Sequence, residues 1–238
     1  MVAKIDLGDI TLDVVKKDIK NVHLSVHPPT GRVRISAPLR MTLDTIRVFA
    51  VSKLEWIKKQ QRRMRAQERE TEREYLDRES HYVWGRRYLL EVIEADGTPG
   101  IELKHNRLIV RFRPRTRSQM KQAIVEEWYR NELKAAVIPL VDKWEPVIGV
   151  TVARIYVQHM KTKWGSCNTV RRNIRLNSEL AKKPKEALEY VLVHELVHLR
   201  ESSHGKRFVA FMDEFMPDWR QRRDMLNTWP VRHERWKY

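Results

Sequence analysis

The sequence predicts an α+β protein, in which N-terminal β-rich units with a long helix precede a C-terminal half where a small sheet packs on one buried helix. Three observations predict this class. Short runs of alternating apolar residues recur between residues 22 and 112, helical spacing dominates from residue 118, and residues 184–200 form a strongly apolar helix. We therefore expect a β-rich region at residues 1–113 and a second domain at residues 114–238.

In the N-terminal part, residues 22–26 and 32–36 alternate around a Pro- and Gly-containing loop, which predicts a pair of strands. From Thr42 the apolar residues follow helical spacing. Residues 58–78 are almost entirely charged, with acids and bases interspersed. Since such residues can pair along a helix, this stretch predicts a solvent-exposed continuation of the same helix, or alternatively a basic patch for a polyanion.

Strand patterning returns at residues 82–93 and 108–112, joined through turn-rich segments. The sequence similarity between the two β-rich regions is too weak to indicate an internal repeat. Residues 118–144 have helical spacing, and a proline inside a helix removes a backbone donor, so we expect a break or kink near Pro139. The helix should end around residues 146–149.

The remaining elements surround the strongest motif of the chain. Residues 151–158 and 173–177 predict two short strands, and residues 184–200 predict a helix that is apolar nearly all round and therefore buried. We expect Trp164 to Cys167 to form the turn between the two strands. Residues 173–177 are either an interior strand or an exposed edge strand able to pair with an extended peptide.

The helix carries His194-Glu195-Leu196-Val197-His198, which matches the H-E-x-x-H pattern. Four residues at 3.6 per turn bring both imidazoles to one face, about 6 Å apart along the axis, so both can hold one metal ion. Glu195 then lies beside the metal and can accept a proton from the metal-bound water. Polar groups on a buried helix are costly unless they are paired, and a metal ion pairs them.

Catalytic zinc usually takes three protein ligands, and His204 is the first candidate for the third. On an unbroken helix His204 would lie about 240° around from His198, so the helix must end before it. The spacing of the three histidines equals that of the metzincins, but Glu201 stands where the metzincin motif has glycine. Glu214 is the alternative third ligand.

Three blocks of the sequence, the H-E-x-x-H helix among them, resemble those of the YgjP-like metal-dependent hydrolases, which are related to the SprT-like and minigluzincin metallopeptidases. These blocks are Lys161-Thr-Lys-Trp-Gly-Ser-Cys167, Asn173-Ile-Arg-Leu-Asn177, and the H-E-x-x-H helix with His204 and Met216-Pro217-Asp218-Trp219. The N-terminal strand pair and Trp84-Gly85-Arg86-Arg87-Tyr88 resemble the same family, so the resemblance covers most of the chain. It implies a zincin-like catalytic half with zinc (Zn2+) held by the three histidines.

The composition indicates in which cellular compartment the protein is expected. The chain is 42% hydrophobic and 33% charged, which is typical of a folded globular protein. No stretch approaches the roughly 20 apolar residues of a membrane helix, and acidic residues lie where a signal peptide would be apolar. We expect a cytoplasmic protein with no membrane partner. Cys167 is the single cysteine, which excludes an internal disulfide and a thiolate metal site.

These observations predict a zinc metallohydrolase, and first of all a metallopeptidase with a peptide or protein substrate. Lys163, Trp164, Asn173 and Arg175 are the candidate substrate-binding residues, and Lys163, Arg175 and His159 are candidates to stabilise negative charge on the substrate. Two alternatives stay open because 47 Lys and Arg against 31 Asp and Glu give a net charge of +16. One is hydrolysis of a nucleoside triphosphate, and the other is a DNA-associated or nucleic-acid-binding role of the basic residues 62–73.

Overall fold

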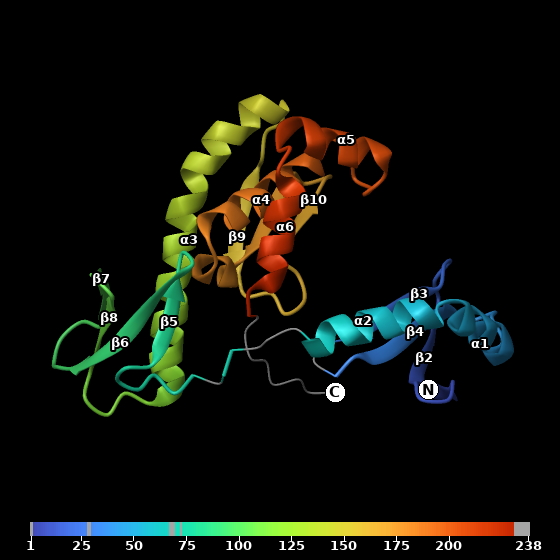
Figure 1. Ribbon diagram of the computed structural model, residues 1–238, viewed down its shortest axis with the longest axis horizontal. Helices are drawn as coiled ribbons and strands as arrows, with labels where there is room; N and C mark the ends of the chain where they lie inside the picture. The colour runs from blue at the N-terminus through green and yellow to red at the C-terminus, as the bar shows by residue number, and fades with distance from the viewer. Residues whose placement is uncertain (1, 28–29, 67–69, 72, 231–238) are drawn as a thin grey trace. The chain divides into compact units, whose positions relative to one another are not determined.

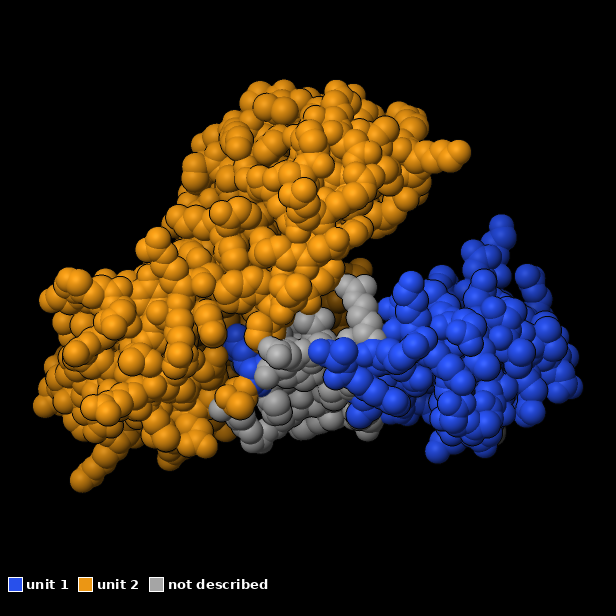
Figure 2. All heavy atoms as spheres, in the orientation of Figure 1, with its two compact units in different colours: residues 1–70, 233–238 blue, residues 71–232 orange. Residues whose placement is uncertain are grey.

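Alternating apolar residues build two four-stranded sheets, one in each compact unit of the chain (Figure 1). The structure is a computed structural model that describes residues 2–27, 30–66, 70, 71 and 73–230. Unit 1 contains residues 1–70, and unit 2 contains residues 71–232 (Figure 2). The division expected from the sequence at residue 113 lies inside unit 2, and it stays a prediction about independently folding domains.

The elements follow one another in this order: β1 (Val2–Asp6), β2 (Thr11–Lys17), β3 (His23–His27), β4 (Arg32–Pro38), α1 (Leu43–Ser52), α2 (Leu54–Ala66), β5 (Ser80–Val83), β6 (Arg86–Glu94), β7 (Gly100–Lys104), β8 (Arg107–Phe112), α3 (Ser118–Ile148), β9 (Arg154–Gln158), β10 (Gly165–Asn168), β11 (Asn173–Asn177), the 3-10 helix η1 (Ser178–Lys182), α4 (Lys185–Val197), α5 (Lys206–Phe215) and α6 (Trp219–Thr228). The mixture confirms the predicted α+β class. No helix in the described ranges is both long and apolar enough to cross a membrane.

The two four-stranded sheets have the same topology. Their strand orders are β1-β2-β4-β3 and β5-β6-β8-β7, and each contains an antiparallel, a parallel and an antiparallel pair in that order. Each inner parallel pair contains a buried apolar pair of residues, Leu12 opposite Val33 in unit 1 and Leu90 opposite Leu108 in unit 2. The two sheets therefore share their topology and their alternation of apolar residues, although the side chains that form the two cores differ.

The charged stretch after α1 is not a helix throughout. A short interruption at Lys53 separates α1 from α2, and α2 ends at Ala66. Residues 73–78, where the sequence analysis expected helix, have none. The rest of the expected continuation lies partly at residues 67–69 and 72, outside the described residues. Ile57 is buried, so α2 packs through its first turn, and further along the helix Gln61 donates to the carbonyl oxygen of Gly31 at 2.8 Å.

The long helix α3 is continuous from Ser118 to Ile148, so the helix does not break at Pro139, and the kink that was the other form of this expectation stays a prediction. Pro139 lies on the exposed side of α3, where water can hydrate the carbonyl that the proline leaves unpaired. The helix ends at Gly149, whose positive φ of 71° forms a left-handed cap. Val125, Tyr129, Leu133 and other residues at helical spacing bury one face of α3 in the core of unit 2.

The core of unit 2 surrounds α4. Nine of its residues are buried: Ala187, Leu188, Tyr190, Val191, Leu192, Val193, Glu195, Leu196 and Val197. A three-stranded sheet of order β10-β11-β9 packs on the same core, with Ile174 and Leu176 of β11 fully buried. This arrangement confirms the small sheet against the H-E-x-x-H helix. Because β11 is the middle strand, the interior alternative for residues 173–177 is correct. One expectation was wrong, because the segment expected to be a turn contributes the edge strand β10.

A single carboxylate, Glu189 on α4, joins three helices. It accepts hydrogen bonds from Lys143 Nζ at 2.7 Å and Trp144 Nε1 at 3.0 Å on α3, and from Arg222 Nη1 at 2.6 Å on α6. Burial alone would raise the pKa of Glu189, but these donors outweigh burial and lower the pKa to about 2. The ionised carboxylate is therefore part of the packing of α4.

We expect Glu189→Gln to lower the melting temperature of the metal-free protein by about 2–6 °C at neutral pH, an effect of about 1–2 kcal/mol after allowance for solvent screening. Because the folded pKa lies below the ordinary value of 4.5, the stabilisation is present above about pH 4.5 and is lost as the pH falls toward 2. Melting curves of both proteins at neutral and acid pH measure this.

The matched control is Glu186→Gln, which removes the same charge from an exposed position on the same helix. Its melting temperature should differ little from that of the unmodified protein. A deficit of Glu189→Gln that stays constant down to pH 2.5 would contradict the role of the ionised form.

Candidate metal centre

The candidate metal centre lies at the C-terminal end of α4. Helical spacing places His194 and His198 on the same face, and the helix ends at Val197 with His198 as its C-cap. The chain then turns, and α5 starts afresh at Lys206 with Gly205 as its N-cap. His204 lies in this turn and folds back toward α4, as the sequence analysis expected.

The three histidines converge on one point. One ligand atom from each of His194, His198 and His204 lies within 4.8 Å of the others. Nε2 of His194 and Nε2 of His204 are only 3.0 Å apart. Glu214, the alternative ligand, lies exposed on α5 and is not part of this group.

The protonation of the histidines suits a metal ion. Nδ1 of His198 lies 3.2 Å from the carbonyl oxygen of Glu201, so Nδ1–H can donate there and leave Nε2 with a free lone pair. Burial, together with the neighbouring His198 and His204, lowers the pKa of His194 to about 3. Burial also lowers the pKa of His198. Neutral imidazoles are the form that binds metal, so the donor set fits a divalent ion such as zinc.

Phe208 of α5 forms an apolar support for the three imidazoles. It is 2% exposed, and its ring centroid lies 4.9 Å from that of His194, 4.7 Å from that of His198 and 4.8 Å from that of His204. Phe208 was not among the predicted site residues. Its position four residues after His204 is the sequence signal that could have indicated its role.

Glu195, the residue that follows His194 on α4, lines the same cleft as the histidines. It is 5% exposed, and burial raises its pKa to about 7 although Lys163 acts in the opposite direction. A carboxyl group with this pKa can both take up and release a proton near neutral pH.

Gly165 at the start of β10 leaves the space that Glu195 occupies. A Cβ atom at Gly165 would lie 2.6 Å from Oε1 of Glu195 and 2.9 Å from Cγ1 of Val191. These distances are below van der Waals contact, so any larger residue would displace the carboxylate. The glycine of the Trp-Gly-Ser-Cys segment is therefore a site residue, which the sequence analysis did not recognise.

The cleft has a volume of about 570 Å³ and lies between α4, the His204 turn and β10. Of the predicted substrate-binding residues, Lys163 and Trp164 line it, whereas Asn173 and Arg175 do not. Arg175 lies on β11 directly opposite Ser166, which lines the cleft, so one strand separates it from the cavity. Cys167 also lines the cleft, and burial followed by the charge of Glu195 raises the pKa of its thiol to about 11, so it is protonated and a poor nucleophile.

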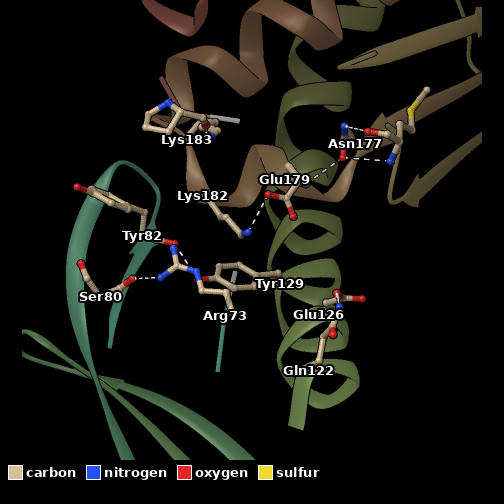
Figure 3. A network of polar contacts seen from close by, with 12 residues as sticks. Arg73, Ser80, Tyr82, Gln122, Glu126, Tyr129, Asn177, Glu179, Lys182 and Lys183 are labelled. Atoms are coloured by element: carbon tan, nitrogen blue, oxygen red, sulfur yellow. Dashed lines mark hydrogen bonds and ion pairs between the residues drawn. The ribbon is translucent and has the colours of Figure 1, made fainter. Parts of the chain in front are cut away.

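A buried asparagine that the sequence analysis did not select holds the loop before β10 in place (Figure 3). Asn177 is 4% exposed, and its Nδ2 donates to the carbonyl oxygens of Met160 at 2.7 Å and Lys163 at 2.8 Å. Its Oδ1 accepts from the backbone N–H of Met160 and of Glu179. One side chain thereby fixes residues 160–163, which present Lys163 to the cleft.

The polar contacts continue from Asn177 into the rest of unit 2 (Figure 3). Glu179 of η1 pairs with Lys182 at 2.7 Å, and Lys182 lies over the ring of Tyr129 on α3. The hydroxyl of Tyr129 donates to the carbonyl oxygen of Tyr82 on β5 at 2.9 Å. The loop at the cleft is thus connected through buried polar groups to α3 and to the four-stranded sheet.

This fold and site define a metal-dependent hydrolase built on an H-E-x-x-H helix. The family model for the YgjP-like metallopeptidase domain matches residues 20–228, and the chain belongs to this family. No curated protein sequence matches the chain.

Two solved structures are similar to part of the chain, and both are metallopeptidase zymogens. Abylysin of Pyrococcus abyssi is 20% identical and has a TM-score of 0.36, with 39% of this chain and 92% of abylysin covered. Jannalysin of Methanocaldococcus jannaschii is 20% identical and has a TM-score of 0.30, with 41% of this chain and 86% of jannalysin covered.

We expect Gly165→Ala to reduce hydrolytic activity by at least about tenfold while metal content stays unchanged, because the new Cβ displaces Glu195 and not the histidines. Turnover and metal content measured on the same samples test this. Gly100→Ala is the matched control, since a Cβ there meets no atom within 4 Å. Full activity of Gly165→Ala would show that the position of the Glu195 carboxylate is not critical.

We expect Asn177→Ala to loosen the loop at residues 160–163, because four hydrogen bonds at a buried position are lost, at about 1–3 kcal/mol for each group left unsatisfied. Hydrogen–deuterium exchange should rise locally at these residues, with α4 still protected. Asn168→Ala is the control, since the side chain of Asn168 is exposed and its Oδ1 accepts a hydrogen bond from the backbone N–H of Arg171. A uniform rise across unit 2 would instead indicate global destabilisation.

Proposed function

We propose that the protein is a zinc metallopeptidase in which His194, His198 and His204 hold the metal and Glu195 acts as the general base. The observation that carries the proposal is the convergence of three imidazoles within 4.8 Å beside a buried carboxyl group. Three nitrogen ligands are the typical set of a catalytic zinc site with one position left for water or substrate. Zinc held there supplies a Lewis acid that activates water and polarises a peptide carbonyl.

Glu195 takes the proton in this mechanism. Its carboxylate accepts a proton from the attacking water molecule, and the carboxylic acid then donates that proton to the leaving amine. A pKa of about 7 makes both transfers feasible at neutral pH, since neither the acid nor the carboxylate is strongly disfavoured. Gly165 keeps the carboxylate in its position.

Lys163 is the group best placed to stabilise negative charge that develops on the scissile carbonyl. It lines the cleft, and it is the charged residue that acts on Glu195. His159 and Arg175, the other two candidates, do not line the cleft. A fixed cation beside the metal lowers the energy of an oxyanion.

β10 is the strand on which an extended peptide can lie. It is the edge strand of the three-stranded sheet and lines the cleft through Gly165, Ser166 and Cys167. Strand addition to an exposed edge supplies backbone hydrogen bonds that do not depend on the substrate sequence. The role expected for residues 173–177 therefore passes to β10.

The two alternatives have weaker support. Hydrolysis of a nucleoside triphosphate needs several cations around the phosphates, and Lys163 is the one Lys or Arg among the described residues that line the cleft. The comparisons with known proteins give no support to a nucleic-acid partner. The basic residues of α2 belong to unit 1, whereas the residues that line the cleft belong to unit 2.

The test is the metal content and the activity of the purified protein beside those of His198→Ala and Glu195→Gln. We expect about one zinc per chain in the unmodified protein and in Glu195→Gln, and at least a tenfold weaker affinity in His198→Ala. Casein turnover should fall by at least about 100-fold in Glu195→Gln, since a general base contributes 10²–10⁴-fold. Unchanged turnover in Glu195→Gln would refute the assignment of the base.

A further inference from the structure

The sheet that borders the cleft, together with its loops, carries an excess of positive charge. Residues 150–178 contain six Lys or Arg residues and no Asp or Glu, whereas the whole chain has 47 basic and 31 acidic residues. The six are Arg154, Lys161, Lys163, Arg171, Arg172 and Arg175. The nearest acidic residues along the chain are Glu145 and Glu179, and Glu179 is buried and paired with Lys182.

Two of these cations lie near the edge where a substrate strand would pair, Arg175 on the strand next to β10 and Arg171 in the β10–β11 hairpin. Arg175 is directly opposite Ser166 of β10, so its side chain leaves the same face of the sheet as that of Ser166. Arg171 lies in the β10–β11 hairpin, and Thr169 of the same hairpin lines the cleft. The backbone N–H of Arg171 donates to Oδ1 of Asn168. Both arginines are exposed.

The spacing of strands puts substrate side chains within reach of these groups. A peptide added beside β10 lies one strand spacing, about 5 Å, from β10 and about 10 Å from β11. Peptide side chains on the same face of the sheet as Ser166 can therefore reach Arg175. The side chain of Arg175 is long enough to pass over Ser166, which is one strand spacing away, and to meet them. The guanidinium of Arg175 lies 5.9 Å from the ring centroid of Tyr156, at the outer limit of a cation–π contact, and this contact competes only weakly.

We propose that the cleft selects peptides that carry acidic side chains on the segment lying along β10, with Arg171 and Arg175 as the residues that determine this preference. The inference rests on the proposed peptidase function and names its substrate class. Carboxylate side chains match guanidinium groups in charge and in hydrogen-bonding geometry. Neither arginine contacts the metal ligands, so the preference is separable from the chemistry at the zinc.

The first measurement compares two peptides of equal length, one with Glu on either side of the scissile bond and one with Gln at the same positions. We expect the acidic peptide to have a kcat/KM about three- to tenfold higher, as two or three exposed charge pairs provide. The ratio should approach one when the salt concentration rises from about 0.05 M to about 0.5 M, because salt screens exposed charges. Nucleoside triphosphate turnover is assayed on the same zinc-loaded protein.

The second measurement uses the double variant Arg171→Gln/Arg175→Gln. We expect its ratio of acidic to neutral turnover to fall at least about threefold, mainly through a higher KM for the acidic peptide. The control is Arg115→Gln/Arg117→Gln, which removes the same charge from exposed positions at the start of α3, the end of that helix far from α5 (Figure 1). This control should keep the ratio of the unmodified protein.

The outcomes separate the inference from the function beneath it. If neither peptide is cleaved by zinc-loaded protein, the proposed peptidase function fails, and nucleotide turnover in that case would favour the alternative. If both peptides are cleaved at equal rates, the function stands and the acidic preference is refuted. A preference that the double variant retains, or that the control also loses, refutes the assignment to Arg171 and Arg175.

Discussion

The fold of unit 2 depends on the burial of α4, a helix that is apolar on nearly every side and yet carries the polar groups of the site. Leu192, Val193 and Leu196 are fully buried, so the helix must be surrounded by α3, α6 and the β10-β11-β9 sheet. This enclosure removes water from Glu195 and His194 and thereby shifts both pKa values toward the neutral forms. The apolar packing that stabilises the fold is thus also what gives the site its chemistry.

The surroundings of α4 are held by a small number of buried polar contacts. Glu189 binds the helix to its neighbours, and Asn177 binds the loop that forms the opposite wall of the cleft. Such groups are costly to bury without partners, so their satisfied hydrogen bonds select one arrangement of the elements. The cleft wall and the helix therefore keep their relative positions although they are far apart in the sequence.

Local patterns in the sequence were sufficient to predict the helices and strands that have a clear apolar periodicity. They were also sufficient to predict that the histidines lie close together, because their spacing follows from helix geometry. Strand pairing was less accessible, because β10 contains glycine, serine, cysteine and asparagine and lacks the alternation of a half-buried strand. The first two strands, β1 and β2, were not recognised either. Gly165 and Asn177 were missed for a related reason, since their roles arise from contacts with Glu195 and with residues 160–163 that only the fold creates. Pro139 does not break α3, because the cost of a proline in a helix depends on which side of the helix faces water.

A comparison of the two sheets shows that a glycine in a turn does not by itself indicate whether that turn packs against another element. Gly8 and Gly85 each lie in the turn between the first two strands of their sheet, with φ values of 73° and 77° that favour glycine. A Cβ at Gly8 would meet open space, whereas one at Gly85 would lie 2.9 Å from Pro184, the N-cap of α4. The neighbouring Trp84 N–H donates to the carbonyl of Ala181 at 2.8 Å. In unit 2 the hairpin thus packs on the N-terminal end of α4, at the opposite end from the histidines, so this sheet helps to anchor the helix that carries the site.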